Sequence, residues 1–198
     1  MNIYDFDNTI YNGDTNKDIL LYSFKKHPFK VIKALNKTKK LERDYKRGLI
    51  TFERVKEAML SFLFEIDDLN GYIEKFVSSH MKNIKPWYLS RKTDYDIVIS
   101  ASYELWIIPF CKKLGIKYVL ATKTDKDGHI IGKNCKGEEK VKRLASTIPN
   151  AQIITSYSDS ESDLPILNIA KTAYVVEGNK LIPYVKGYKF KNKNWYYY

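Results

Sequence analysis

Apolar residues follow two different spacings along this chain. Residues 14–89 carry the three- to four-residue spacing of helices that bury one face, most clearly at Leu69, Tyr72, Ile73, Phe76 and Val77. From residue 94 onward, short continuous apolar runs of strand length alternate with helical segments, and one such run, Ile3-Tyr4, also opens the chain. The pattern predicts an α/β protein whose first strand is separated from the others by a helical insertion.

The alternating part of the chain predicts a sheet. Beyond the first strand, we expect strands at residues 96–100, 117–121, 152–156 and 173–176, and helices at 101–114, 138–147 and 162–170. Asp127-Gly128, with Ile130-Ile131 behind it, predicts a hairpin. Strands that alternate with helices favour a Rossmann-like parallel sheet with helices on both faces. Residues 1–13 and 90–198 would form this α/β core, and residues 14–89 an inserted all-helical cap.

The composition is that of a globular protein, with 44% hydrophobic and 14% aromatic residues. No apolar run approaches the length of a membrane span, and no basic, apolar signal segment precedes the first strand, which predicts a cytoplasmic location. Cys111 and Cys135 lack metal-ligand spacing, so we expect free thiols. The aromatic end, residues 195–198, is expected to be a strand or a packed tail.

The charge is strongly basic. Lys and Arg total 34 against 23 acidic residues, a formal net charge of +11, and a local basic cluster runs from Lys25 to Arg47. Such a surface attracts anions: nucleic acid, an anionic membrane face or phosphorylated metabolites. Solubility explains a basic surface more simply than a specific polyanion partner does, so a nucleic-acid partner is not expected.

Two carboxylates, Asp5 and Asp7, directly follow the first apolar run. Side chains alternate on an extended segment, so both can point to one side while Phe6 points to the other. Carboxylates this close repel each other unless a cation lies between them or one keeps its proton. Mg²⁺ binds carboxylates together with phosphate oxygens, and a carboxylate can attack phosphorus while its neighbour transfers the proton. The pair therefore indicates phosphoryl chemistry.

Further polar residues close two of the later strands, at Ser100 and Asp159. Ligands bind at the carboxyl ends of parallel strands, so these residues are expected beside Asp5 and Asp7. The amide groups of Ala101 and Ser102, at the expected start of a helix, would offer an anion site next to the Ser100 hydroxyl.

A lysine and a second carboxylate complete the candidate site. Lys140 lies near the start of a helix that follows the Gly137 turn, so its ammonium could reach the same crevice. Asp163 follows Asp159 by four residues, and the two could cap a helix or support a cation.

The chain resembles the haloacid dehalogenase-like hydrolases, and in particular their phosphoserine-phosphatase-like branch, which carries a small helical cap after the first motif. The resemblance extends to about Val176 and rests on four segments in the same order: Asp5-Phe6-Asp7-Asn8-Thr9, Ile99-Ser100-Ala101-Ser102, Gly137-Glu138-Glu139-Lys140, and residues 157–165 around Asp159 and Asp163.

The resemblance implies a role for each matching residue. Asp5 would be the nucleophile and Asp7 the general acid/base. Mg²⁺ would be bound by Asp5, Asp159 and the backbone carbonyl of Asp7. The residues expected around the phosphoryl group and the metal are Thr9, which would orient Asp7 or its turn, Ser100, Ala101 and Lys140, with Asp163 supporting the metal ligands.

The sequence departs from this branch where the substrate would bind. Ala101 and Ser102 stand where glycines are usual, and the cap arginine that reads a substrate carboxylate has no match, Lys56 being the nearest cation. Asp14 matches an acidic residue that reads the substrate amine. The resemblance therefore implies a Mg²⁺-dependent phosphatase that hydrolyses a small phosphorylated metabolite, a phosphomonoester, through an aspartyl-phosphate. A phosphorylated amine or alcohol is at least as plausible a substrate as serine phosphate.

Two other classes of function fit parts of the sequence. A phospho-accepting signalling module also combines aspartates, a hydroxyl and a lysine on a parallel sheet, although its acceptor lies on a mid-domain strand and it has no inserted cap. A polyanion- or nucleic-acid-binding protein with little catalytic activity would fit the net charge, and salt-dependent binding without turnover would identify it.

Overall fold

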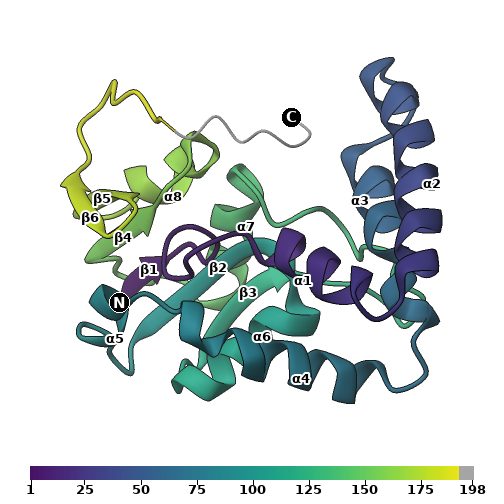
Figure 1. Ribbon diagram of the computed structural model, residues 1–198. Helices are drawn as coiled ribbons and strands as arrows, with labels where there is room; N and C mark the ends of the chain where they lie inside the picture. Colours follow the sequence, from purple (N-terminus) through teal and green to yellow (C-terminus); the bar gives the residue numbers. More distant parts are fainter. Residues whose placement is uncertain (192–198) are drawn as a thin grey trace.

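The computed structural model describes residues 1–191, and a six-stranded sheet lies at its centre (Figure 1). The strands run in the order β3-β2-β1-β4-β5-β6, and all neighbours are parallel except β5 and β6. Their bounds are β1 Asn2–Tyr4, β2 Asp96–Tyr103, β3 Tyr118–Thr122, β4 Thr155–Ser158, β5 Thr172–Glu177 and β6 Lys180–Pro183. The predicted α/β fold with a parallel sheet is confirmed.

Helices surround this sheet. The α-helices are α1 Thr15–Phe24, α2 Pro28–Lys46, α3 Phe52–Leu60, α4 Leu69–His80, α5 Pro86–Leu89, α6 Glu104–Leu114, α7 Glu138–Thr147 and α8 Leu164–Asn168, and short 3₁₀ helices cover Ser61–Glu65, Met81–Asn83 and Glu161–Asp163. Asp14 caps α1, because its carboxylate accepts the amide hydrogens of Asn16 and Lys17.

Each face of the sheet has its own hydrophobic core. Ile3, Ile97 and Ile99 belong to one cluster of buried residues, while Tyr4 and Val98, which alternate with them along β1 and β2, belong to the other. Strand residues that are buried on both faces read as a continuous apolar run, as these do. Phe6 points into the larger core, where its ring contacts Tyr11 and Phe110, so the turn after β1 is anchored on the side away from the two aspartates.

The predicted cap region, residues 14–89, contains two different kinds of helix. Helices α2 and α3 pack against each other and stand upright at one side of the sheet, whereas α4 lies along α6 (Figure 1). The ring of Phe76 on α4 contacts Phe110 on α6 and is completely buried. This contact ties the end of the inserted segment to the sheet, and the division of the chain into core and cap stays a prediction.

The second strand is longer than predicted, and this corrects the anion site expected at Ala101 and Ser102. Strand β2 continues through Tyr103, and α6 begins only at Glu104. The register against β3 shifts between Ile99 and Tyr103, so an irregularity in the strand rather than a helix carries residues 100–102. Their amides are therefore not at a helix start.

Smaller differences lie at other boundaries. The fourth strand is Thr155–Ser158 rather than 152–156, and the helix expected at 162–170 is a 3₁₀ turn followed by the short α8. Asp127-Gly128 lies in a turn, and the chain returns antiparallel through a bridge between Thr124 and Ile130 and hydrogen bonds from the Asp125 amide to the His129 carbonyl and from the Ile131 amide to the Lys123 carbonyl. The predicted hairpin is therefore present, although its two sides are too short to count as strands. Strand β6 was not predicted. The expectation for residues 195–198 lies outside the described residues.

Two other expectations concern the described chain. Over residues 1–191, none of the helices combines the length and the apolar character needed to cross a bilayer.

Cys111 and Cys135 are both buried and free, and burial raises the pKa of the Cys135 thiol to about 11. The predicted free thiols are confirmed.

The docking of α4 on the core can be tested with two substitutions of the same type. Phe76→Ala is expected to lower the free energy of unfolding by roughly 3–5 kcal/mol, because it empties a fully buried ring site between α4 and α6. Phe29→Ala, at an exposed position of α2, is the matched control and should cost less than about 0.5 kcal/mol. Urea denaturation measures both, and equal losses would contradict the packing described.

Candidate active site

A cavity of about 520 Å³ opens at the carboxyl ends of the central strands. Strands β1, β2 and β4 contribute polar groups to it, as expected where the strand order of a parallel sheet reverses. Helices α1, α2 and α3 provide an opposite wall that is largely apolar, made of Leu20, Leu21, Leu35, Phe52 and Met59. One end of the cavity is therefore acidic and hydrogen-bonded, and the other is lined with hydrocarbon.

Lys140 joins two carboxylates from distant parts of the chain. Its Nζ lies 2.7 Å from Asp5 Oδ1 and 2.7 Å from Asp163 Oδ2, and the lysine side chain is almost completely buried. Although burial alone would lower the pKa of Lys140, the carboxylates of Asp163 and Asp5 raise it, so the ammonium form is maintained. Ser158 also donates to Asp163 Oδ2, at 2.7 Å.

Asp159 lies next to Asp5, and Thr9 connects them. The Thr9 hydroxyl lies 3.2 Å from Asp5 Oδ2 and 3.5 Å from Asp159 Oδ1, and its oxygen accepts the Asp159 amide hydrogen. Thr9 is fully buried, contacts these two aspartates rather than Asp7, and is not among the residues that line the cavity. The Thr9 side chain thus contacts Asp5 and Asp159, and its expected role in orienting Asp7 or its turn stays a prediction.

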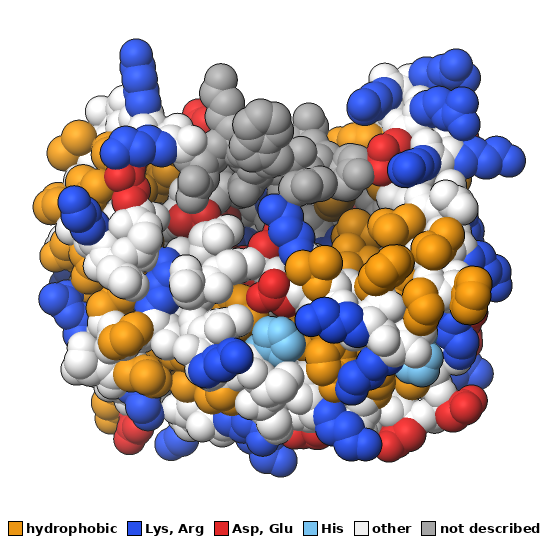
Figure 2. Space-filling view, in the orientation of Figure 1, with side chains coloured by type: hydrophobic (Ala, Val, Ile, Leu, Met, Phe, Trp, Pro, Cys, Tyr) orange, Lys and Arg blue, Asp and Glu red, His pale blue; other side chains and the backbone are white. Residues whose placement is uncertain are grey.

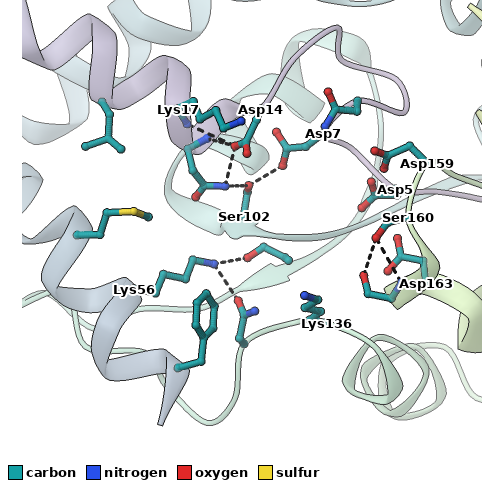
Figure 3. A pocket seen from close by; sticks show the side chains of 18 of the residues that line it. Asp5, Asp7, Asp14, Lys17, Lys56, Ser102, Lys136, Asp159, Ser160 and Asp163 are labelled. Atoms are coloured by element: carbon teal, nitrogen blue, oxygen red, sulfur yellow. Dashed lines mark hydrogen bonds between the residues drawn. The ribbon is translucent and has the colours of Figure 1, made fainter. Parts of the chain in front are cut away.

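Two other groups hold Asp7. The Thr15 amide at the start of α1 donates to Asp7 Oδ1 at 2.6 Å. The Ser102 hydroxyl donates to Asp7 Oδ2, also at 2.6 Å (Figure 3). Trp106 Nε1 donates to Thr15 Oγ1 and so fixes the position of the helix start. Asp7 is thus oriented by one strand end and one helix end.

Burial shifts the pKa values of both aspartates upward. Burial raises the pKa of Asp5 to about 6, and the Lys140 ammonium offsets part of that effect. Burial, with the charge of Asp14 next in size, raises the pKa of Asp7 to about 7, against the two hydrogen bonds that favour its ionised form. A carboxyl group with a pKa near neutrality can both give and take a proton.

The predicted serine, Ser100, lies beneath the cavity wall. It is completely buried, and its hydroxyl oxygen accepts the amide hydrogen of Ser102. Ala101 and Ser102 line the cavity, whereas Ser100 is not among the lining residues. The sequence predicted a role for the Ser102 amide but not for its hydroxyl. Ser102 lies two residues beyond Ser100, and on an extended segment this spacing places the two hydroxyl groups on the same side of the strand.

The two candidate specificity residues face the cavity from opposite sides. Asp14 caps α1, and Lys56 reaches from α3 to donate to the Ala101 carbonyl and, at 2.8 Å, to Asn134 Oδ1 (Figure 3). Lys56 also lies over the Tyr103 ring, 4.7 Å from its centroid. Burial lowers the pKa of Lys56 to about 7.

The loop between β3 and α7 adds residues that the sequence did not indicate. Asn134 and Lys136 both line the cavity, and burial lowers the pKa of Lys136 to about 8. Neither belongs to a strand or helix, so no periodicity marks them. Their only signal is their position shortly before Gly137 and Lys140.

The oxygen atoms around Asp5 could hold a hard cation. Within the described residues, no group of three or more His, Cys, Asp or Glu side chains has an arrangement suited to a metal ion. A site made of the Asp5 and Asp159 carboxylates and the Asp7 backbone carbonyl requires only two acidic side chains. Nearby, Asp163 Oδ1 is buried without a hydrogen-bond partner, which leaves an acceptor for a metal-bound water or another donor.

Several known proteins are similar to this chain. A histidinol-phosphatase of Neisseria meningitidis serogroup C is 26% identical over 196 residues, which cover 88% of each chain. A Bordetella pertussis protein of unknown function has the same fold, with a TM-score of 0.72, 20% identity and coverage of 88% of each chain. A phosphoserine phosphohydrolase-like protein of Francisella tularensis has a TM-score of 0.53, 16% identity and coverage of 88% and 87%.

Residues 3–168 match the model of the haloacid dehalogenase-like hydrolase family. The matched range begins in β1, ends in α8 and contains Asp5, Asp7, Lys140, Asp159 and Asp163. The chain therefore belongs to the haloacid dehalogenase-like hydrolases and is an enzyme of the phosphatase type.

Proposed function

We propose that this protein is a Mg²⁺-dependent phosphatase that hydrolyses a small phosphomonoester through an aspartyl-phosphate on Asp5. The observation that carries the proposal is the arrangement around Asp5: Lys140 at 2.7 Å, Asp159 across a shared threonine hydroxyl, and Asp7 two residues away in the same cavity. These groups supply a nucleophile, a cation, a proton carrier and a place for a metal within one site.

In the first step, an Asp5 carboxylate oxygen attacks phosphorus, and the bond from phosphorus to the ester oxygen breaks. Asp7 gives its proton to the departing alcohol, and its pKa of about 7 suits that role. In the second step, Asp7 takes a proton from water, the water oxygen attacks phosphorus, and the acyl-phosphate bond breaks to release phosphate and regenerate the Asp5 carboxylate. Ser102 and the Thr15 amide hold Asp7 in the same position in both steps.

Mg²⁺ would be held by Asp5, Asp159 and the Asp7 carbonyl, with Asp163 in support. When bound, the ion neutralises charge on the phosphoryl oxygens and on Asp5. The buried, hydrogen-bonded aspartates and the unpaired Asp163 oxygen support this assignment, because an added cation would relieve the repulsion among them.

Lys140 would also contact the phosphoryl oxygens. Ser102 and the Ala101 segment are better candidates for the other contacts than Ser100 and Thr9, because the latter two are completely buried. Ser100 would then act through the Ser102 amide, and Thr9 through Asp5 and Asp159.

The substrate would extend from this site toward α1–α3, with residues 14–89 acting as its lid. Asp14 offers a carboxylate that suits an amine, and Lys56 faces it across the cavity (Figure 3). Together with the similarity to a histidinol-phosphatase, this favours a phosphorylated amino alcohol, such as histidinol phosphate, over serine phosphate.

The nucleophile can be tested directly. Asp5→Asn is expected to abolish turnover of a panel of phosphomonoesters in the presence of Mg²⁺, because an amide does not attack phosphorus. Phosphate release is the measurement, and the panel should include histidinol phosphate and phosphoserine. Asp18→Asn, a second aspartate that lies outside the cavity lining, is the control. Unchanged turnover in Asp5→Asn would refute the assignment.

Lys140 can be tested through stability. Lys140→Met leaves Asp5 and Asp163 facing each other without their cation, and it should lower the free energy of unfolding by roughly 3–5 kcal/mol at neutral pH. The loss should shrink as the pH falls, because protonated carboxyl groups no longer repel. Lys142→Met, at an exposed position of the same helix, should change stability by less than about 0.5 kcal/mol. Denaturant titrations at several pH values decide between these outcomes.

The lowered pKa of Lys56 predicts a different dependence of the folding stability on pH. Its folded pKa of about 7 lies below the unfolded value of 10.5, so between these values the unfolded chain binds one more proton. The stability of the wild type relative to Lys56→Met should therefore rise with pH above 7, by at most about 1.4 kcal/mol per unit. A stability difference that stays constant from pH 6 to about 9 would show that Lys56 keeps its ordinary pKa.

A further inference from the structure

One face of the molecule combines exposed apolar side chains with lysine and arginine. Five residues form what we call the apolar face: Leu21, Phe24, Phe29, Ile32 and Leu35. Phe29 is 86% exposed and Leu21 63% exposed, values that are unusual for large apolar side chains lying together. Figure 2 shows apolar side chains gathered over α1 and the adjoining end of α2.

The helical spacing explains why these side chains lie together. On α2, Phe29, Ile32 and Leu35 are three residues apart, so they share one side of the helix, while Val31 and Ala34 point to the buried side. On α1, Leu21 and Phe24 have the same spacing, and α1 contacts α2. The apolar face is therefore not the side on which α2 packs against α3.

Basic residues continue the same side of α2. Beyond Leu35, the exposed residues Lys39, Arg43 and Lys46 follow at spacings of four and three residues. Residues 25–47 contain ten basic residues against two acidic ones, Glu42 and Asp44. Figure 2 shows lysine and arginine side chains over the far end of α2, next to the apolar cluster.

The apolar face is continuous with the mouth of the cavity. Leu21 and Leu35 belong to both, and Leu20, Phe52 and Met59 extend the apolar wall inward. A surface that met this face would therefore lie at the entrance through which a substrate reaches Asp5.

We propose that the apolar face and the basic end of α2 dock on an anionic lipid surface. Apolar side chains inserted into the acyl boundary, with cations around them at the headgroups, are the arrangement by which amphipathic helices bind in a membrane interface. The side of the cavity that carries Leu21 and Leu35 then lies at the lipid surface.

Charge and chemistry disfavour the two other occupants. A second copy of the chain would bring the same ten basic residues against the first, and like charges would repel. A nucleic acid would meet the lysines and arginines and could stack bases on Phe24 and Phe29. The other three side chains of the face, Leu21, Ile32 and Leu35, are aliphatic and suit an acyl boundary better than a base.

Co-sedimentation of the full chain with lipid vesicles tests the docking. The protein should bind vesicles that contain phosphatidylglycerol and should bind pure phosphatidylcholine vesicles much more weakly, and high salt should weaken the binding. Equal binding to both kinds of vesicle, or no binding to either, overturns the proposal.

Matched variants connect the binding to this face. Phe29→Ser with Ile32→Ser should reduce vesicle binding about tenfold or more, while Ile154→Ser, at an exposed apolar position elsewhere, should leave it unchanged. Lys39→Gln with Arg43→Gln should reduce it about 30-fold, and Lys142→Gln with Lys171→Gln should leave it nearly unchanged. Circular dichroism checks that each variant is folded. Control variants that bind as weakly as the face variants would overturn the assignment of this surface.

Two further measurements address the other occupants. Sedimentation velocity detects a dimer, and fluorescence anisotropy detects binding to an oligonucleotide. Docking on lipid predicts that the Phe29→Ser and Ile32→Ser changes affect neither measurement. A dimer or an oligonucleotide complex that those changes abolish, in a protein that does not bind vesicles, would replace the proposal with that partner.

Discussion

The contact of Lys140 with Asp5 and Asp163 is the interaction on which the rest of the structure depends. The three groups are buried, so their charges cannot be compensated by water and must be compensated by one another. The contact also joins the first strand to α7 and to the turn after β4, segments separated by up to 158 residues of chain. The sheet order, with β1 between β2 and β4, brings those segments to one edge.

The residues around this contact are held by strand pairing, ring packing and hydrogen bonds. Asp5 and Asp7 follow a strand that is hydrogen-bonded on both sides, and Phe6 between them is fixed in the core by Tyr11 and Phe110. Lys85, from the end of the inserted segment, donates to the Asn8 carbonyl and so holds the turn after Asp7. Pre-positioned groups of this kind lower the reorganisation needed during phosphoryl transfer.

The opposite wall of the cavity has a different character. It consists of side chains from helices α1, α2 and α3, and it is mostly apolar, with Lys56 buried among them. These helices contact the strand ends through the Thr15 amide of α1, which holds Asp7, and through Lys56 of α3, which donates to the Ala101 carbonyl. The apolar side chains of the wall line the same cavity but take no part in those contacts. This separation explains how one phosphoryl-transfer site can serve different substrates, and why the family match and the geometry indicate the reaction more strongly than the substrate.

Local patterns in the sequence determined much of this structure. The two spacings of apolar residues predicted the parallel sheet, the helical insertion and the position of Asp5 and Asp7 at a strand end, because strand and helix periodicities follow from backbone geometry. The same patterns failed where tertiary contacts override them: β2 continues through Ser102 to pair Tyr103 with Thr122, and β6 exists because it pairs with β5. Only the tertiary structure decided that Ser102 rather than Ser100 reaches Asp7, that Thr9 joins Asp5 to Asp159, and that an apolar wall faces the carboxylates. Such pairings join residues that are distant in sequence, so no local spacing can specify them; they exist once the chain has closed on itself.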